Sequence, residues 1–221
     1  MKDRIYRYVV RYDTGVAPNP FGGWCSLAIC KPAIRRTAQV GDWIIGLRSQ
    51  QAAQVLYVMQ VEHCLSFADY WRDPRFLAKR PDRCPSSDNI YRPDASGDLV
   101  QVPNRAHVPS DTQRDLSGQQ VLVGRRFWYF GDRSPELPAD LAHLVHASQG
   151  HSLQKNRRDT DVQTLVDWLS GWSNGIHGSP IDADRLHAAG VNTHLVDRSG
   201  CGVKPQHPFT APGPAAGRMG C

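Results

Sequence analysis

The sequence lacks the motifs by which common nucleotide and cofactor enzymes are recognised. It contains no G-x-x-x-x-G-K-[ST] run for a nucleoside triphosphate and no G-x-G-x-x-G run for a dinucleotide. Its six cysteines include no C-x-x-C pair, which a zinc knuckle would need. The sequence therefore predicts no metal and no cofactor, and it favours reduced cysteines over a disulfide framework.

Long hydrophobic runs are also missing. No apolar stretch approaches the length that spans a bilayer, and the start MKDRIYRYVV has charges without the apolar core of a signal peptide. We therefore expect a cytoplasmic protein with no membrane partner. Six tryptophans and a hydrophobic fraction of 40% are typical of a folded chain. We expect one domain over residues 1–198 and a disordered tail over 199–221, where glycine, proline and alanine are frequent.

Positive charge is in modest excess. The formal net charge is +5 and the pI is near 9.0, which favours polyanionic partners such as nucleic acid. Basic pairs occur at Arg35–Arg36 and Arg125–Arg126, each beside an expected strand or helix. These pairs belong either to a phosphate-facing patch or to an ordinary solvated surface, and both interpretations stay open.

Strand patterns dominate the first two thirds of the chain and helix patterns the last third. Strands are predicted over 5–12, 25–30, 43–45, 54–65 and 119–130, with 43–45 and 54–65 forming a hairpin-like pair. Helices are predicted from Ser66 to near Pro74, over 136–148 and over 159–172. The fold class is therefore α+β, and residues 81–117 form a long polar, turn-rich insertion or loop.

The stretch Gly15–Pro32, GVAPNPFGGWCSLAICKP, is crowded with glycine, proline, aromatic rings and cysteine. It could be a metal knuckle on Cys25 and Cys30, a loop with a nucleophilic thiol, or one wall of a pocket for a flat ligand. The metal site is disfavoured because the gap between the cysteines is wider than the usual knuckle spacing. The thiol is disfavoured because no neighbouring pattern shows an activating base. No catalytic residue is identified.

Aromatic rings lie beside polar, loop-borne groups at several places. Flat rings stack on nucleobases at about 1–3 kcal/mol each, and Asp or Asn side chains can bind a base edge. The alternative is core burial, which is commoner for aromatic residues in strands. The rings concerned are Phe21, Trp24, Trp43, Tyr91, Trp128 and Tyr129.

Several separated motifs together resemble one protein family. The segments YVVRYDTGVAPNPFGGWCSLAICKPAIRRTAQVGDWIIG, DYWRDPRF, SDNIYRP and RFWYFG are similar to the bacterial and phage proteins called nucleotide modification associated domain 2, which are labelled as DNA base hypermodification proteins. The segment GDWIIG is also similar to PUA-like folds of the EVE and ASCH group, small β-barrels that hold a modified or extruded base. The resemblance implies a PUA-like, partly closed β-barrel with helices packed around it.

The resemblance also implies a site in which Gly15–Pro32 forms a rim. Its base-binding residues would be Asn19, Phe21, Trp24, Asp42, Trp43, Asp88, Asn89, Tyr91 and Tyr129. Its phosphate-binding residues would be Lys31, Arg35, Arg36 and Arg125. The alternative is that Asp42 only fixes a turn and that Asp88 and Asn89 only cap a loop.

The function implied is recognition of a modified or flipped base in DNA, or in RNA, within a base-modification or phage-conflict system. An enzyme that installs or processes the modification is the alternative from another class, and a protein-interaction module without a nucleotide pocket is a third. An enzyme pocket brings a group with a strongly perturbed pKa within reach of the base, whereas a reader needs only shape, stacking and neutral hydrogen bonds.

Overall fold

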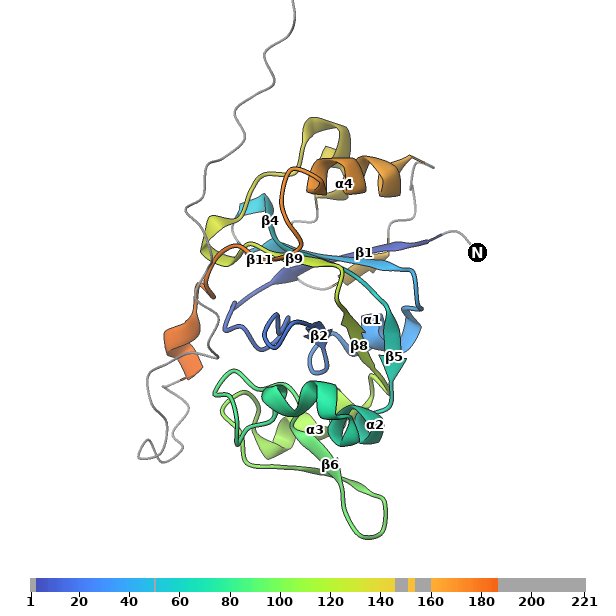
Figure 1. Cartoon of the computed structure of the whole chain (residues 1–221), viewed down its shortest axis with the longest axis vertical. Coiled ribbons are helices and arrows are strands. Elements are labelled where there is room, and N and C mark those ends of the chain that lie inside the picture. The colour runs from blue at the N-terminus through green and yellow to red at the C-terminus, as the bar shows by residue number, and fades with distance from the viewer. Residues whose placement is uncertain (1–2, 50, 146–150, 154–159, 187–221) are drawn as a thin grey trace, which may run out of the picture.

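A six-stranded mixed sheet forms the centre of the protein (Figure 1). The computed structural model describes residues 3–49, 51–145, 151–153 and 160–186. The strand order is β10-β1-β3-β4-β9-β11. These strands are β1 (Ile5–Val10), β3 (Trp43–Arg48), β4 (Gln51–Gln60), β9 (Phe127–Tyr129), β10 (His151–Leu153) and β11 (Gly175–Ile176). β1 runs parallel to β3, whereas β3 and β4 form the predicted antiparallel hairpin.

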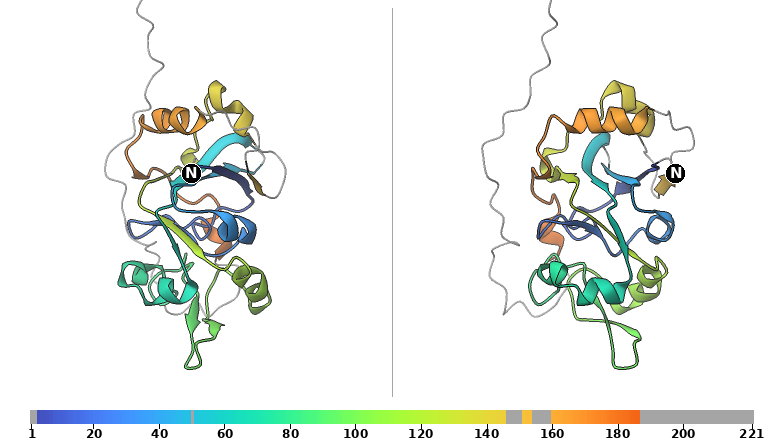
Figure 2. Two further views of the ribbon diagram at one scale, coloured as in Figure 1. Left: turned by 90° about the vertical axis from the view of Figure 1, so that its right-hand side faces the viewer. Right: turned by 45° about the vertical axis from the view of Figure 1, so that its right-hand side comes forward.

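One face of this sheet is covered by helices. Alternate residues of a strand point to opposite sides, so Trp43 and Ile45 of β3 face the same way. They pack in one apolar cluster with Leu165 and Leu169 of α4 (Asp161–Leu169) and with Leu141 of the 3₁₀ helix η4 (Ala139–Leu144). Figure 2 shows α4 and η4 on the same side of the sheet.

The other face of the large sheet packs against a three-stranded antiparallel sheet in the order β2-β8-β5. Its strands are β2 (Cys25–Leu27), β8 (Val121–Gly124) and β5 (His63–Leu65). Tyr8, Ile44 and Tyr57 of the large sheet share a buried cluster with Leu27 of the small one. Helix α1 (Pro32–Thr37) follows β2 and begins at proline, which suits the first helical turn.

The lower end of the molecule in Figure 1 is built from short elements around a third apolar cluster. They are α2 (Phe67–Arg72), the 3₁₀ helix η1 (Pro74–Lys79), the two-stranded ribbon β6 (Tyr91–Pro93) and β7 (Leu99–Gln101), and α3 (Thr112–Leu116). Ser66 caps α2 as predicted, because its Oγ accepts the Asp69 N–H at 3.0 Å. Further 3₁₀ turns are η2 (Pro109–Asp111), η3 (Gly131–Arg133) and η5 (Ala183–Leu186).

The α+β class predicted from the sequence is confirmed, but the barrel is not. The strands of the described part of the chain form three separate sheets that do not join into a closed barrel. A PUA-like fold therefore stays a prediction. The expected helix over 136–148 is a short 3₁₀ helix, η4, within the residues that the structure describes.

The single strand expected over 119–130 is wrong, because the chain changes sheets within it. β8 belongs to the small sheet and β9 to the large one. The change occurs after Gly124, where an added Cβ would lie 2.1 Å from the Gln60 carbonyl oxygen, closer than any side chain allows. Only glycine permits this approach of the two backbones.

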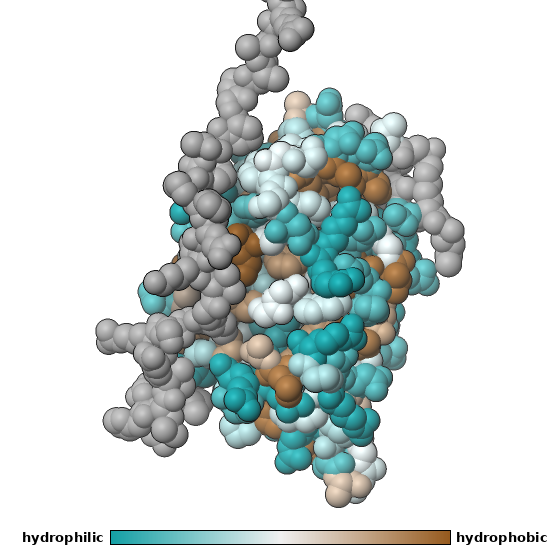
Figure 3. Space-filling view, in the orientation of Figure 1, coloured by the Kyte–Doolittle hydropathy of each residue, from teal (hydrophilic) through white to brown (hydrophobic). Residues whose placement is uncertain are grey.

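The expected tail, residues 199–221, lies outside the described residues, as does the expected domain boundary at residue 198. Within the described part of the chain, no helix is long and apolar enough to cross a membrane. Hydrophilic residues cover most of the face shown in Figure 3, and hydrophobic residues appear there in separate patches.

Candidate active site

A cavity of about 640 Å³ lies along β1 and the loop that follows it. This volume is within the usual range for small-molecule sites. The other walls come from the turn before α1, the polar segment before α3, and η5. The lining residues are Tyr8, Val10, Arg11, Tyr12, Thr14, Val16, Ala17, Cys30, Lys31, Arg105, Ala106, His107, Arg114, Arg185 and Leu186.

Cys30 lines the cavity from the turn that joins β2 to α1. Its φ is 61° and that of Lys31 is 40°, in the left-handed region that residues other than glycine rarely adopt. Two hydrogen bonds hold the turn. The Cys30 N–H donates to Asp115 Oδ1 at 3.2 Å, and the Cys30 carbonyl accepts from Arg35 Nε at 2.8 Å. The surrounding structure therefore fixes the position of the thiol.

His107 and Asp115 complete a chain of side chains that begins at Cys30. The Cys30 Sγ lies 3.4 Å from His107 Nε2, and His107 Nδ1 lies 2.5 Å from Asp115 Oδ2. Asp115 is fully buried and also accepts the Tyr91 hydroxyl at 2.9 Å. The backbone N–H of His107 donates to Asn104 Oδ1 at 2.8 Å. In such a chain an imidazole activates a nucleophile, and a carboxylate orients the imidazole.

The charges and hydrogen bonds of Cys30, His107 and Asp115 favour a charged imidazole at His107. Burial acts to lower the pKa of His107, but hydrogen bonds with Asp115 and Cys30 outweigh burial and raise the pKa to about 10. Burial acts to raise the pKa of Asp115, yet the hydrogen bond and positive charge of His107 bring that pKa below its usual range. His107 is therefore protonated at neutral pH, and it places a positive charge beside the Cys30 sulfur.

Lys31 lines the same cavity directly after Cys30. Its Nζ donates to the Val9 carbonyl at 3.3 Å and lies 4.7 Å from the centre of the Tyr8 ring. Burial lowers the pKa of Lys31. The structure thus places one of the predicted phosphate-binding residues at the cavity wall.

Most of the predicted base-binding residues lie elsewhere, in buried hydrogen-bond networks. Lys79 Nζ donates to Asn19 Oδ1 at 2.8 Å, and burial lowers the pKa of Lys79 to about 8. Asp88 accepts from Ser26 Oγ at 2.6 Å and from the Tyr70 hydroxyl at 2.8 Å. Burial raises the pKa of Asp88. These groups satisfy one another inside the protein, so a base cannot reach them.

Other predicted base-binding residues also have structural contacts. Asp42 fixes its turn by accepting the Gln39 N–H at 2.8 Å and the Arg4 N–H at 2.9 Å. Trp43 is fully buried and stacks on Trp128, with 6.4 Å between ring centres. Two more are buried as well: Asn89 Nδ2 donates to the Tyr70 carbonyl at 2.9 Å, and the Tyr129 hydroxyl donates to Asp13 Oδ1 at 2.7 Å. These residues do not form the base pocket that the resemblance implied.

Arg35, predicted to bind phosphate, lies inside the protein and not at its surface. Its guanidinium is fully buried and donates to the carbonyls of Cys30 at 2.8 Å, of Gln120 at 2.9 Å and of Asp115. Burial lowers the pKa of Arg35 to about 10. The neighbouring Arg36 is exposed and donates to the Ser117 carbonyl at 3.0 Å. Arg35 therefore holds the backbone of Cys30 and of Asp115 in place through its hydrogen bonds.

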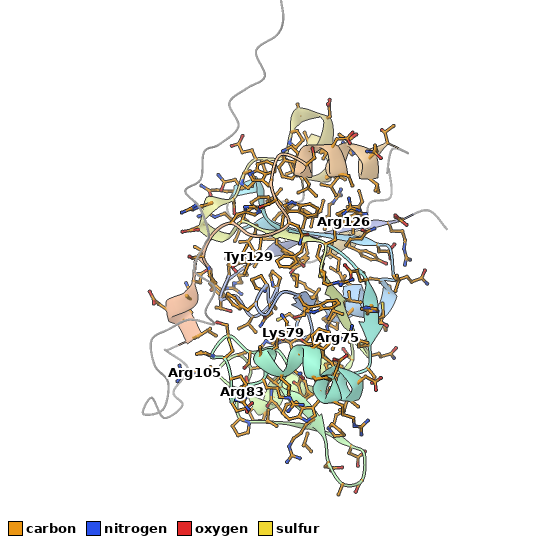
Figure 4. All side chains as sticks on the ribbon, in the orientation of Figure 1. Arg75, Lys79, Arg83, Arg105, Arg126 and Tyr129 are labelled. Atoms are coloured by element: carbon orange, nitrogen blue, oxygen red, sulfur yellow. The ribbon has the colours of Figure 1, made fainter. Side chains whose placement is uncertain are left out.

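Trp24 lies on a surface separate from the cavity. The half-buried ring has the guanidinium carbons of Arg75 and Arg125 each 5.1 Å from its centre. Figure 4 shows Arg75 and the cavity residue Arg105 on different sides of the lower half of the molecule. Phe21, in the same loop as Trp24, is also half-buried. Of the predicted site residues, Trp24 and Arg125 are thus brought together, away from Cys30.

Other candidate chemistries find less support. In the described residues there is no group of three or more His, Cys, Asp or Glu side chains that could hold a metal ion. Cys25, Cys30 and Cys64 are free thiols. Residues 171–175, GWSNG, match G-x-S-x-G, but they follow α4 and lead into β11, whereas a nucleophile elbow joins a strand to a helix.

A family model described as nucleotide modification associated domain 2 matches residues 2–187. The chain belongs to the nucleotide modification associated domain 2 family. The family name indicates involvement in nucleotide modification, and thereby an association with nucleic acid. No curated protein and no solved structure matches the chain significantly.

In this member of the nucleotide modification associated domain 2 family, sequence reasoning missed His107 and Asp115. Both lie in the polar stretch 81–117, which was expected to be an insertion or a loop with functional contacts. Cys30 was considered and set aside because no base lies near it in the sequence. His107 is the single histidine of that stretch, but six aspartates lie there, so the sequence does not single out Asp115.

Proposed function

We propose that this protein modifies a nucleotide through a covalent intermediate on Cys30. Membership of a family named for nucleotide modification supports the substrate class. The observation that carries the proposal is the approach of His107 Nε2 to within 3.4 Å of Cys30 Sγ at the wall of a cavity, with Asp115 bound to the other side of the imidazole. A protein that only reads a modified base needs no such arrangement.

The proposed reaction has two halves. The thiol proton of Cys30 resides on His107, and the thiolate attacks an electrophilic carbon of the substrate. A sulfur–carbon bond forms, the bond from that carbon to the leaving group breaks, and the leaving group takes the electron pair and the proton of His107. Water or an acceptor then gives a proton to His107 and takes the carbon from sulfur. Asp115 stays ionised throughout and orients the imidazole.

The test compares two thiols of the same chain. Iodoacetamide is applied at about pH 6.5, and alkylation of Cys30 and Cys64 is followed by peptide mass spectrometry. Cys64 is a free thiol whose pKa is raised by burial. Even an ordinary thiol is only about 1% thiolate at this pH. Because a stabilised thiolate is intrinsically less nucleophilic, we expect Cys30 to react about tenfold faster than Cys64, rather than a hundredfold.

Variants of the histidine distinguish this mechanism from simple exposure of the thiol. His107→Ala should reduce the Cys30 alkylation rate to that of an ordinary thiol. His143→Ala is the matched control, since His143 Nε2 also faces a buried carboxylate, Asp161 Oδ2, at 3.0 Å, but does not line the cavity. The proposal fails if Cys30 reacts no faster than Cys64, or if both histidine variants behave like wild type.

A second candidate function is recognition of a modified or flipped base in DNA, which Trp24 favours. A half-buried indole beside two guanidiniums is suited to stack on a base while the cations meet phosphate. The PUA-like fold and the phage-conflict setting that would accompany such a reader are supported only by the resemblance. This candidate locates nucleic-acid binding at Trp24, not at Cys30.

Binding of oligonucleotides with ordinary and modified bases tests the second candidate. Trp24→Ala should lose about 1–3 kcal/mol of binding, mainly for the preferred base. Trp71→Ala is the control, because Trp71 also has a guanidinium, that of Arg80, 4.2 Å from its ring centre. Circular dichroism checks that both variants fold. An unchanged base preference in Trp24→Ala would exclude this site as the reader.

A further inference from the structure

Positively charged side chains surround the cavity, and among the described residues no aspartate or glutamate lines it. The cationic residues of the lining are Arg11, Lys31, Arg105, Arg114 and Arg185, together with the protonated His107. The buried carboxylate of Asp115 is engaged by His107, Tyr91 and the Cys30 N–H, beneath the wall. A cavity with this lining favours an anionic ligand.

Two of these cations flank one aromatic ring beyond the end of β1. Tyr12 is 44% exposed, and the guanidinium carbons of Arg185 and Arg11 lie 3.9 Å and 5.1 Å from its ring centre. Arg185 Nε donates to Asp182 Oδ1 at 3.0 Å, and Asp182 Oδ2 accepts the Asp13 N–H at 2.9 Å. The backbone thus fixes the carboxylate that holds Arg185. We call Arg11, Tyr12 and Arg185 the arginine end of the cavity.

Cys30 lines the part of the cavity next to Lys31 and Tyr8. Lys31, next to it, contacts Tyr8 and the Val9 carbonyl, whereas Tyr12 lies further along the chain, beyond the end of β1. The same cavity is thus lined by the thiol next to Lys31 and Tyr8 and by the paired guanidiniums beside Tyr12, four residues further along the chain. Guanidinium is the side-chain group that best matches a phosphate, because its planar N–H donors bind two phosphate oxygens together.

We propose that the arginine end binds the phosphate of a nucleotide whose base faces Cys30. The choice of a nucleotide, rather than another phosphorylated ligand, rests on the proposed function. A base stacked within a duplex cannot enter such a cavity, so the ligand is either a free nucleoside monophosphate or a nucleotide flipped out of a strand. The two sources present the same phosphate chemistry to Arg11 and Arg185.

Equilibrium binding to the full-length Cys30→Ser variant tests this proposal, since that variant cannot form the covalent intermediate. Calorimetric titrations compare the four deoxynucleoside 5′-monophosphates, the corresponding nucleosides, inorganic phosphate, and a short oligonucleotide with one mismatched base. We expect at least one monophosphate, or the mismatched oligonucleotide, to bind about tenfold or more tightly than the matching nucleoside.

Arginine variants locate the phosphate. Arg185→Ala should remove most of the advantage of the phosphorylated ligand over the nucleoside, and Arg185→Lys should retain part of it. Arg48→Ala is the control, because Arg48 Nη1 donates to Gln54 Oε1 at 2.9 Å and Arg48 does not line the cavity. Circular dichroism confirms that each variant folds.

The outcomes separate this inference from the proposed function. Loss of binding in Arg185→Ala with the free monophosphate supports a free nucleotide, and the same loss only with the oligonucleotide supports a flipped one. The inference is overturned if nucleosides bind as tightly as their phosphorylated forms, if no probe binds, or if Arg48→Ala and Arg185→Ala have equal effects. Rapid alkylation of Cys30 would persist in each of those cases, because it requires no ligand.

Discussion

Replacement of Arg35 by methionine tests whether this residue is a structural clamp or a phosphate ligand. The buried guanidinium donates to the carbonyls of Cys30, Gln120 and Asp115. Methionine fills much of the space but donates no hydrogen bond. Each buried acceptor left without a donor costs about 1–3 kcal/mol. Removal of the desolvation cost of the charge offsets part of this loss, so we expect a decrease of about 3 kcal/mol in the free energy of unfolding.

Thermal and urea unfolding, followed by circular dichroism, measure this decrease. In a chain of this size 1 kcal/mol corresponds to about 2–4 °C, so Tm should fall by about 6–12 °C. Arg36→Met is the matched control, because the adjacent arginine is exposed and makes one hydrogen bond, to Ser117. Its Tm should change by less than about 2 °C. Similar Tm values for the two variants would show that the hydrogen bonds of Arg35 do not stabilise the fold. A stable Arg35→Met protein with weakened, less salt-dependent nucleic-acid binding would restore the phosphate role.

Two further outcomes are expected. Gly124→Ala should lower the free energy of unfolding in urea by several kcal/mol, because the added Cβ would lie 2.1 Å from the Gln60 carbonyl oxygen. Gly171→Ala is the control and should be tolerated, since the nearest atom to its Cβ would be 3.5 Å away. Equal stability of the two variants would contradict the described change of sheets. The pKa of His107 is raised from 6.5 to about 10, so its stabilising effect is complete below about pH 6.5 and is lost as the pH rises through about 10. Urea unfolding between these pH values should show a loss of stability in wild type that is smaller in His107→Gln, and parallel pH profiles would argue against the charged imidazole.

Local patterns predicted much of the secondary structure. The hairpin of β3 and β4 and the Ser66 cap of α2 follow from neighbouring residues, so the sequence alone was sufficient. The division of 119–130 between two sheets depends on the close approach of Gly124 to a distant backbone, which no local pattern reveals. The arrangement of strands in separate sheets depends on the same kind of long-range packing.

The candidate site was less predictable, because its residues are distant in sequence. His107 is 77 positions from Cys30, and no spacing rule joins them. The polar residues chosen from the sequence were of the correct chemical type for binding a base. The same types also satisfy internal donors and acceptors, as Asn19 and Asp88 do here. Residue type alone cannot distinguish these uses, whereas burial does.

The convergence of separate segments on Asp115 has a consequence for the newly made chain. Cys30 is synthesised 85 positions before the carboxylate that holds its backbone and orients His107. At about 5–20 residues per second, translation leaves an interval of roughly 4–17 s in which the thiol exists without its partners. During that interval Cys30 has neither the imidazole nor the carboxylate of the folded site beside it. The site at Cys30 can therefore form only after residues 107 and 115 have been synthesised.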